Sequence, residues 1–147
     1  MTPPKRVILH IGLPKTGSSS IQASLSGVDT GEVRVVRFGE TLFHNLPLTT
    51  LLSDDPARMR QHLNRGHSPT QVEARRARWD AAFDTELARR TPTLLLSAEV
   101  ISNAPPDKLH ALADRIEASG RRLEVFAYVR EPIGLFGSAL QQRLKLF

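Results

Sequence analysis

One short segment near the start of the chain combines the residue types of an anion-binding loop. Residues 10–22 read HIGLPKTGSSSIQ, where an apolar run ends at Gly12 and three hydroxyl residues lead into a helical pattern. A strand that turns onto a helix N-terminus directs backbone N–H groups and the positive end of the helix dipole to one point. Lys15 adds a full charge there, so the segment predicts a site for phosphate or sulfate. The residues expected to form it are Lys15, Thr16, Gly17, Ser18, Ser19 and Ser20.

A second pair of candidate anion-binding residues lies near the other end of the chain. Arg130 follows the apolar run LEVFAYV, and Ser138 stands eight residues later, about two turns into a helix that we expect to begin near Pro132. A guanidinium and a hydroxyl in these positions can reach the same phosphate group, because the planar fork of arginine suits phosphate oxygens. The alternative is structural: Arg130 pairs with Glu131, and Ser138 is a small helix residue.

The pattern of the whole chain indicates which elements position these residues. Apolar runs of strand character alternate with helical patterns, which is typical of an α/β fold with a parallel sheet of about four strands flanked by helices. The expected elements are strands at 6–11, 32–38, 93–97 and 123–129, helices at 18–26, 51–63, 69–90 and 105–120, a loop at 39–47 and a turn at 64–68. Ligands of such folds bind beyond the carboxyl ends of the strands. The residues expected at that edge are 12–20, 38–44, 97–99 and Arg130.

Composition and charge limit the class of protein. The 147 residues suffice for a single domain, 1–147, and the net charge of +5 suits an acidic cofactor or substrate. The chain lacks the aromatic platform of single-strand binders and any helix-turn-helix pattern, so we expect no nucleic acid partner. No run reaches membrane-spanning length, and the apolar stretch near the N-terminus is short and interrupted, so we expect no membrane partner and a cytoplasmic location. Because cysteine and metal-ligand spacings are absent from the sequence, neither a disulfide frame nor a metal site is expected.

The two anion-binding segments resemble those of one enzyme family. The common nucleotide loop has its lysine after the second glycine, whereas Lys15 precedes Gly17 here. The run Pro-Lys-Thr-Gly-Ser-Ser-Ser resembles the sulfotransferase loop that holds the 5′-phosphosulfate end of 3′-phosphoadenosine 5′-phosphosulfate (PAPS). Val-Arg-Glu-Pro with Ser138 resembles the segment that binds the 3′-phosphate in the same family, and TLLLSAEVIS at 93–102 looks like the family's central strand.

This resemblance implies a fold of the P-loop nucleotide hydrolase type, PAPS as the sulfuryl donor and 3′-phosphoadenosine 5′-phosphate (PAP) as the product. The acceptor would be a hydroxyl or amine of a small molecule or glycan, selected by the loops at 39–50 and 64–71. Lys15 would stabilise charge on the bridging oxygen of the leaving phosphate, and no metal is required. The family's domains are usually longer, so we expect either a truncated domain or a homo-oligomer in which copies of the chain complete the core.

A base must take the proton of the acceptor. His44 follows the second expected strand and Glu99 follows the third, so both can reach the edge, whereas His10 lies inside a strand and is expected to be a hydrogen-bonded core residue. Two other functions stay open. A P-loop nucleotide kinase or NTPase would need a Walker-type lysine and an acidic Mg²⁺ ligand, for which Glu99 is the weak candidate. A truncated, non-catalytic relative would bind only nucleotide or a partner protein.

Overall fold

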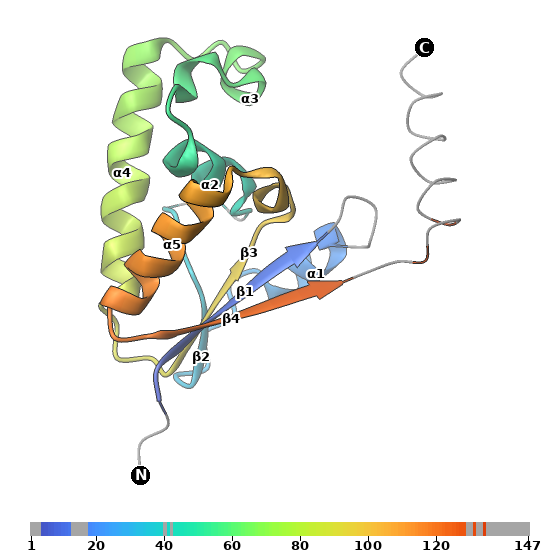
Figure 1. Cartoon of the computed structure of the whole chain (residues 1–147), viewed down its shortest axis with the longest axis vertical. Helices are drawn as coiled ribbons and strands as arrows, with labels where there is room; N and C mark the ends of the chain where they lie inside the picture. The colour runs from blue at the N-terminus through green and yellow to red at the C-terminus, as the bar shows by residue number, and fades with distance from the viewer. Residues whose placement is uncertain are drawn as a thin grey trace.

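The computed structural model of the chain contains a parallel sheet with helices on both faces (Figure 1). It describes residues 4–12, 18–39, 41, 43–128, 131 and 134. Within these ranges the sheet has four strands in the order β2-β3-β1-β4, which confirms the predicted α/β class. The strands are β1 Arg6–Gly12, β2 Val33–Val35, β3 Thr93–Ser97 and β4 Arg122–Tyr128. The helices are α1 Ser18–Leu25, α2 Asn45–Leu52, α3 Arg60–Leu63, α4 Pro69–Leu87 and α5 Pro106–Ala118, with 3-10 turns η1 Pro56–Arg58 and η2 Glu99–Asn103.

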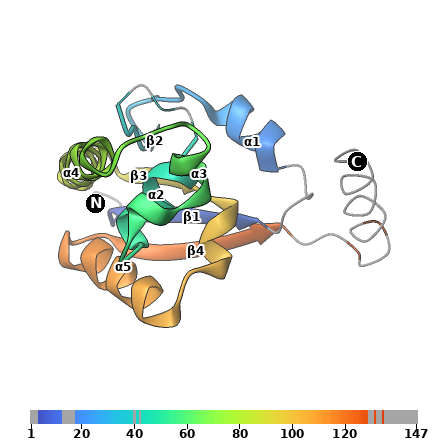
Figure 2. The ribbon, with the colours of Figure 1, turned by 90° about the horizontal axis from the view of Figure 1, so that it is seen from above.

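The hydrophobic core lies on one face of the sheet. Alternate residues of β1 and β3 point into it and pack against the apolar faces of α2, α4 and α5. On the other face, Gln22 of α1 donates to Ser97 of β3. Figure 2 shows α1 towards the β2 end of the sheet and α5 beside β4. The core consists of Val7, Leu9, Val36, Phe38, Leu48, Trp79, Phe83, Leu87, Leu94, Leu96, Ala98, Ile101, Leu112 and Ile116.

The two long helices begin or end where the sequence predicts. At the start of α4 the hydroxyl of Ser68 accepts a hydrogen bond from the Gln71 N–H at 3.3 Å, and the Gln71 side chain accepts one from the Ser68 N–H at 2.9 Å. This capping box satisfies two N–H groups at the helix terminus. After α5 the chain passes through Gly120 at φ +76°, a left-handed conformation that glycine adopts without steric cost.

The prediction of one continuous helix at 51–63 is wrong. The segment is divided into α2, η1 and α3, because the proline ring at Pro56 disfavours a helical backbone at Asp55 and Pro56 has no N–H to donate. The loop expected at 39–47 is also too long, since α2 already begins at Asn45. Pro47 falls within the first turn of α2, where a missing N–H costs nothing.

The second strand is shorter than the expected 32–38. β2 comprises Val33–Val35, and the Val36 N–H donates one further hydrogen bond to Leu95 O at 3.0 Å. The chain then bends, so that Phe38 enters the core and the following residues lead to α2. Burial of this aromatic ring outweighs the strand preference of its neighbours.

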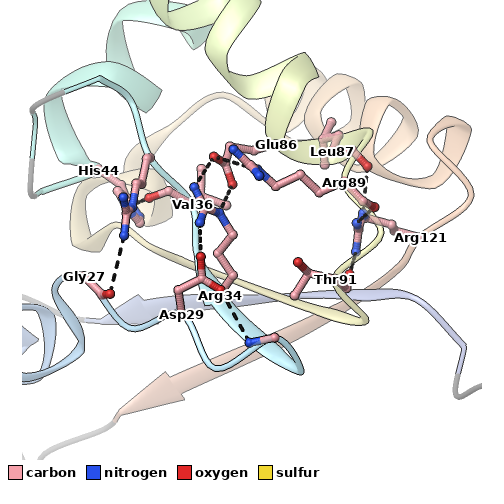
Figure 3. Close-up of polar contacts among 12 residues, drawn as sticks. Gly27, Asp29, Arg34, Val36, His44, Glu86, Leu87, Arg89, Thr91 and Arg121 are labelled. Atoms are coloured by element: carbon pink, nitrogen blue, oxygen red, sulfur yellow. Dashed lines mark hydrogen bonds and ion pairs between the residues drawn. The ribbon is translucent and has the colours of Figure 1, made fainter.

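Two buried arginines hold the strands to α4 on the core side (Figure 3). Arg34 on β2 forms a two-pronged ion pair with Glu86 at 2.7 and 2.9 Å and also contacts Asp29. Arg121, just before β4, donates to backbone carbonyls at the end of α4 and in the turn that follows. Since the last carbonyls of a helix lack partners within the helix, the Arg121 guanidinium serves as the C-terminal cap of α4.

Candidate functional site

The polar centre of the carboxyl edge is Ser97, the last residue of β3. Its backbone N–H donates to Nδ1 of His44 at 2.9 Å, and its hydroxyl lies 2.8 Å from Nδ1 of His10. The Gln22 side-chain amide donates to the Ser97 carbonyl and hydroxyl, both at 3.2 Å. Through these contacts Ser97 joins β3 to β1, to α1 and to the start of α2, and we call these four residues (Ser97, His44, His10 and Gln22) the Ser97 cluster.

His44 is the most deeply held member of the Ser97 cluster. Its side chain is buried, with the residue 3% exposed, and Nε2 donates to Val36 O at 2.9 Å while Nδ1 accepts from Ser97 N–H. Burial lowers the pKa of His44 to about 4, partly opposed by the hydrogen bond to Val36. Both ring nitrogens are therefore engaged in a neutral imidazole, and this geometry favours a structural role, namely holding the chain after β2 against β3.

His10 lies on β1, next to Ser97 of β3 on one side and Phe126 of β4 on the other. The residue is 7% exposed, and burial lowers its pKa, an effect that the nearby Glu99 carboxylate opposes. The rings of Phe126 and Tyr128 on β4 lie 6.0 and 5.9 Å from the imidazole centroid. Within the described part of the chain, its Nε2 is buried and has no hydrogen-bond partner. A buried ring nitrogen without a partner is uncommon and requires an explanation.

Glu99 is half-buried and opens η2 directly after β3. Its backbone N–H donates to Oδ1 of Asn45 at 2.9 Å, which ties this turn to the start of α2. Because its charge raises the pKa of His10, the Glu99 carboxylate lies within electrostatic range of the Ser97 cluster. Of the two base candidates, Glu99 is half-buried whereas His44 is buried.

The central anion-binding residues of the sequence-based prediction lie outside the described residues: Lys15, Thr16, Gly17, Arg130 and Ser138. The strand ends that lead to them are described. Gly12 of β1 pairs with Tyr128 of β4 in the parallel register, so these two neighbouring strands end at the same level. Two chain segments that start side by side at one edge can contribute to one ligand site.

The first turn of α1 stands at this same edge. The helix begins at Ser18, as predicted, and Ser20 in its first turn is exposed. Gln22, one turn further, fastens α1 to Ser97, so the N-terminus of the helix is fixed relative to β1 and β3. The partial positive charge of a helix N-terminus favours an anion at this position.

The sequence predicted that the site lies at the carboxyl edge of the sheet, but it indicated no role for Gln22 or Ser97. Gln22 stands at a position of α1 where an apolar residue would be expected, and this could have indicated that it has a buried polar partner. Among the described residues, no three His, Asp or Glu side chains gather as a metal site would need. No helix in the same ranges combines the length and the apolar character required to cross a bilayer.

Comparison of the chain with models of protein families, with curated proteins and with solved structures returns no match. Inference about function therefore depends on the residues and the geometry of the carboxyl edge.

Proposed function

We propose that this chain is a sulfotransferase domain with a P-loop-like fold that transfers a sulfuryl group from PAPS to a hydroxyl or amine of a small-molecule or glycan acceptor. The observation that carries the proposal is the pairing of Gly12 with Tyr128. The loop with Lys15 starts directly after the first of these residues, and Arg130 follows the second by two positions. One nucleotide with phosphates at both ends of its ribose can span two such segments.

The strand order supports a ligand crevice at this edge. The chain leaves β1 through α1 to reach β2 at one side of the sheet, and it leaves β3 through η2 and α5 to reach β4 at the other side. The neighbouring strands β1 and β3 therefore have connections that run to opposite sides of the sheet. Open α/β sheets bind ligands outside the carboxyl ends of such a strand pair. The Ser97 cluster lies at the carboxyl end of β3, where it joins β3 to β1.

In the proposed reaction, the acceptor oxygen or nitrogen forms a bond to sulfur as the bond from sulfur to the bridging phosphate oxygen breaks. PAP departs with the electron pair of that bond, and Lys15 stabilises the charge that it gains. The backbone N–H groups from Thr16 to Ser19, with the Ser18 and Ser19 hydroxyls, hold the 5′-phosphate, while Arg130 and Ser138 hold the 3′-phosphate.

Glu99 is the base that we propose for the acceptor proton. It follows β3 at the carboxyl edge, and its side chain is half-buried, whereas His44 uses both ring nitrogens within the fold. Proton transfer requires a base within hydrogen-bond reach of the acceptor. The cytoplasmic location remains part of this proposal.

Calorimetry with PAP, adenosine 5′-phosphate and ATP·Mg²⁺ tests the proposal. We expect PAP to bind about tenfold to a hundredfold more tightly than adenosine 5′-phosphate, because the 3′-phosphate adds charge-assisted hydrogen bonds. Arg130→Met should remove that preference, and Lys15→Ala should abolish sulfate transfer from labelled PAPS to a panel of hydroxyl and amine acceptors. Lys5→Ala is the matched control, because the Lys5 side chain is exposed and donates to Arg89 O at 3.3 Å, near the opposite edge of the sheet.

Three results would contradict parts of the proposal. Tighter binding of ATP·Mg²⁺ than of PAP would favour a nucleotide kinase or NTPase. PAP binding without transfer to any acceptor would favour a non-catalytic relative that retains the nucleotide site. Equal transfer by wild type and by Lys15→Ala would refute the role of Lys15.

A further inference from the structure

The hydrogen bonds of the Ser97 cluster determine which nitrogen of His10 carries a proton. The Ser97 carbonyl can only accept, so the Gln22 atom that lies 3.2 Å from it is the amide nitrogen, a donor. The same nitrogen lies 3.2 Å from the Ser97 hydroxyl and donates its second hydrogen there. The orientation of the Gln22 amide is thereby assigned.

The Ser97 hydroxyl has a single hydrogen to donate. Because it accepts from Gln22, that hydrogen is available for Nδ1 of His10, 2.8 Å away. The opposite assignment, in which Nδ1 donates to the hydroxyl, would leave the Ser97 hydrogen without an acceptor in a buried position, which is disfavoured. The neutral His10 ring therefore accepts at Nδ1 and carries its proton on Nε2.

The Nε2–H group is turned away from β3, because the two nitrogens of an imidazole point in divergent directions and Nδ1 faces Ser97. The aromatic rings beside His10 belong to the strand on the other side, since Phe126 pairs with His10 in the β1–β4 register. This donor is buried without a hydrogen-bond partner in the described part of the chain. Leaving an N–H in that state costs stability, so retention of the group calls for a partner that binds from outside.

We propose that Nε2–H of His10 is a hydrogen-bond donor for an oxyanion, a sulfate or phosphate oxygen of a ligand bound at the carboxyl edge between β1 and β4. The inference deepens the proposed function and rests on it for the identity of the nucleotide. His10 lies two residues before Gly12, whose partner is Tyr128, so a ligand that crosses from one strand end to the other passes next to the imidazole. In this role His10 binds the ligand as a donor and is not the base that takes the acceptor proton. The lowered pKa of His10 is consistent with a neutral donor.

Long-range ¹H–¹⁵N NMR of the full chain reads the tautomer directly. We expect the His10 spectrum to show protonation at Nε2, and we expect the Nε2 resonance to move on addition of inorganic sulfate or of PAP. Protonation at Nδ1 in the ligand-free chain would overturn the assignment. An Nε2 resonance that stays unmoved while calorimetry shows either anion bound would overturn the proposed contact.

Two substitutions separate the contact from the fold. His10→Asn keeps a polar group near Ser97 but removes the distal donor, and it should weaken PAP or sulfate binding roughly tenfold to a hundredfold. His10→Gln extends an amide N–H towards the position of Nε2 and should recover part of that affinity. Urea midpoints of both variants control for folding, and equal affinity of wild type and a folded His10→Asn would refute the contact.

The two ligands also separate this inference from the proposed function. If sulfate moves the Nε2 resonance and PAP does not bind, the oxyanion contact stands and the nucleotide assignment fails. If PAP binds and the Nε2 resonance stays unmoved, the nucleotide assignment stands and the contact fails. If neither anion binds, both are refuted.

Discussion

Replacement of Arg121 by methionine should destabilise the fold more than any surface change. The residue is 1% exposed, and its guanidinium donates to Leu87 O at 2.9 Å, Thr91 O at 3.0 Å and Arg89 O at 2.6 Å. Methionine fills much of the same volume but donates no hydrogen bond, so these three carbonyls, at the end of α4 and in the turn that follows, lose a donor. The Arg121 side chain therefore stabilises the fold through hydrogen bonds to backbone carbonyls.

The size of the effect follows from the contacts. A buried polar group left without a partner costs about 1–3 kcal/mol, and water can reach the partly buried carbonyls, so we expect a loss of about 4 kcal/mol in the free energy of unfolding. That is a large share of the roughly 5–15 kcal/mol that stabilises a typical domain. Each kcal/mol lowers Tm by about 2–4 °C in a domain of this size, so Tm should fall by about 8–16 °C.

Trp79 provides the assay. It is the single tryptophan of the chain and belongs to the core, so its fluorescence follows unfolding in urea. Arg122→Met is the matched control, because the Arg122 side chain is 74% exposed and its ion pair with Glu124 spans 3.7 Å. The control should change the free energy of unfolding by less than about 0.5 kcal/mol. A loss below about 1 kcal/mol for Arg121→Met, or a loss equal to that of the control, would refute the capping role.

Two further predictions concern pH and helix capping. Because burial lowers the pKa of His44 from 6.5 to about 4, the unfolded chain takes up the proton first, and stability should fall as pH decreases through that window. Uptake of one proton over this range corresponds to a loss of about 3 kcal/mol in the free energy of unfolding. Urea unfolding of His44→Asn should therefore depend less on pH than that of wild type. The control His110→Asn, at an exposed position, should keep the pH dependence of wild type. Ser68→Ala should cost about 1 kcal/mol by removing half of the capping box of α4, and Thr70→Ala, exposed in the same turn, should cost less; equal losses would argue against the cap.

The elements that the sequence predicted well have strong local causes. β1, β3 and the start of α4 follow from apolar runs and from the Ser-Pro sequence that opens a helix, so neighbouring residues suffice to specify them. The region between β2 and α4 was predicted poorly. In that region Phe38 packs in the core and Pro56 interrupts the helical pattern. The short η2 after β3 was not predicted either. The conformation of such segments depends on packing against residues distant in the sequence, which a local sequence pattern does not predict.

The candidate site divides in a similar way. The sequence by itself predicted anion-binding chemistry, because the loop with Lys15 and the Arg130–Ser138 pair match such sites in residue type and spacing; these residues lie outside the described part of the chain. Only the tertiary structure decided that β1 and β4 are neighbours, because the register of Gly12 with Tyr128 joins positions more than a hundred residues apart. The same holds for the Ser97 cluster: hydrogen bonds between distant segments, formed where water is excluded, gave His44 a structural place and left one nitrogen of His10 without a partner.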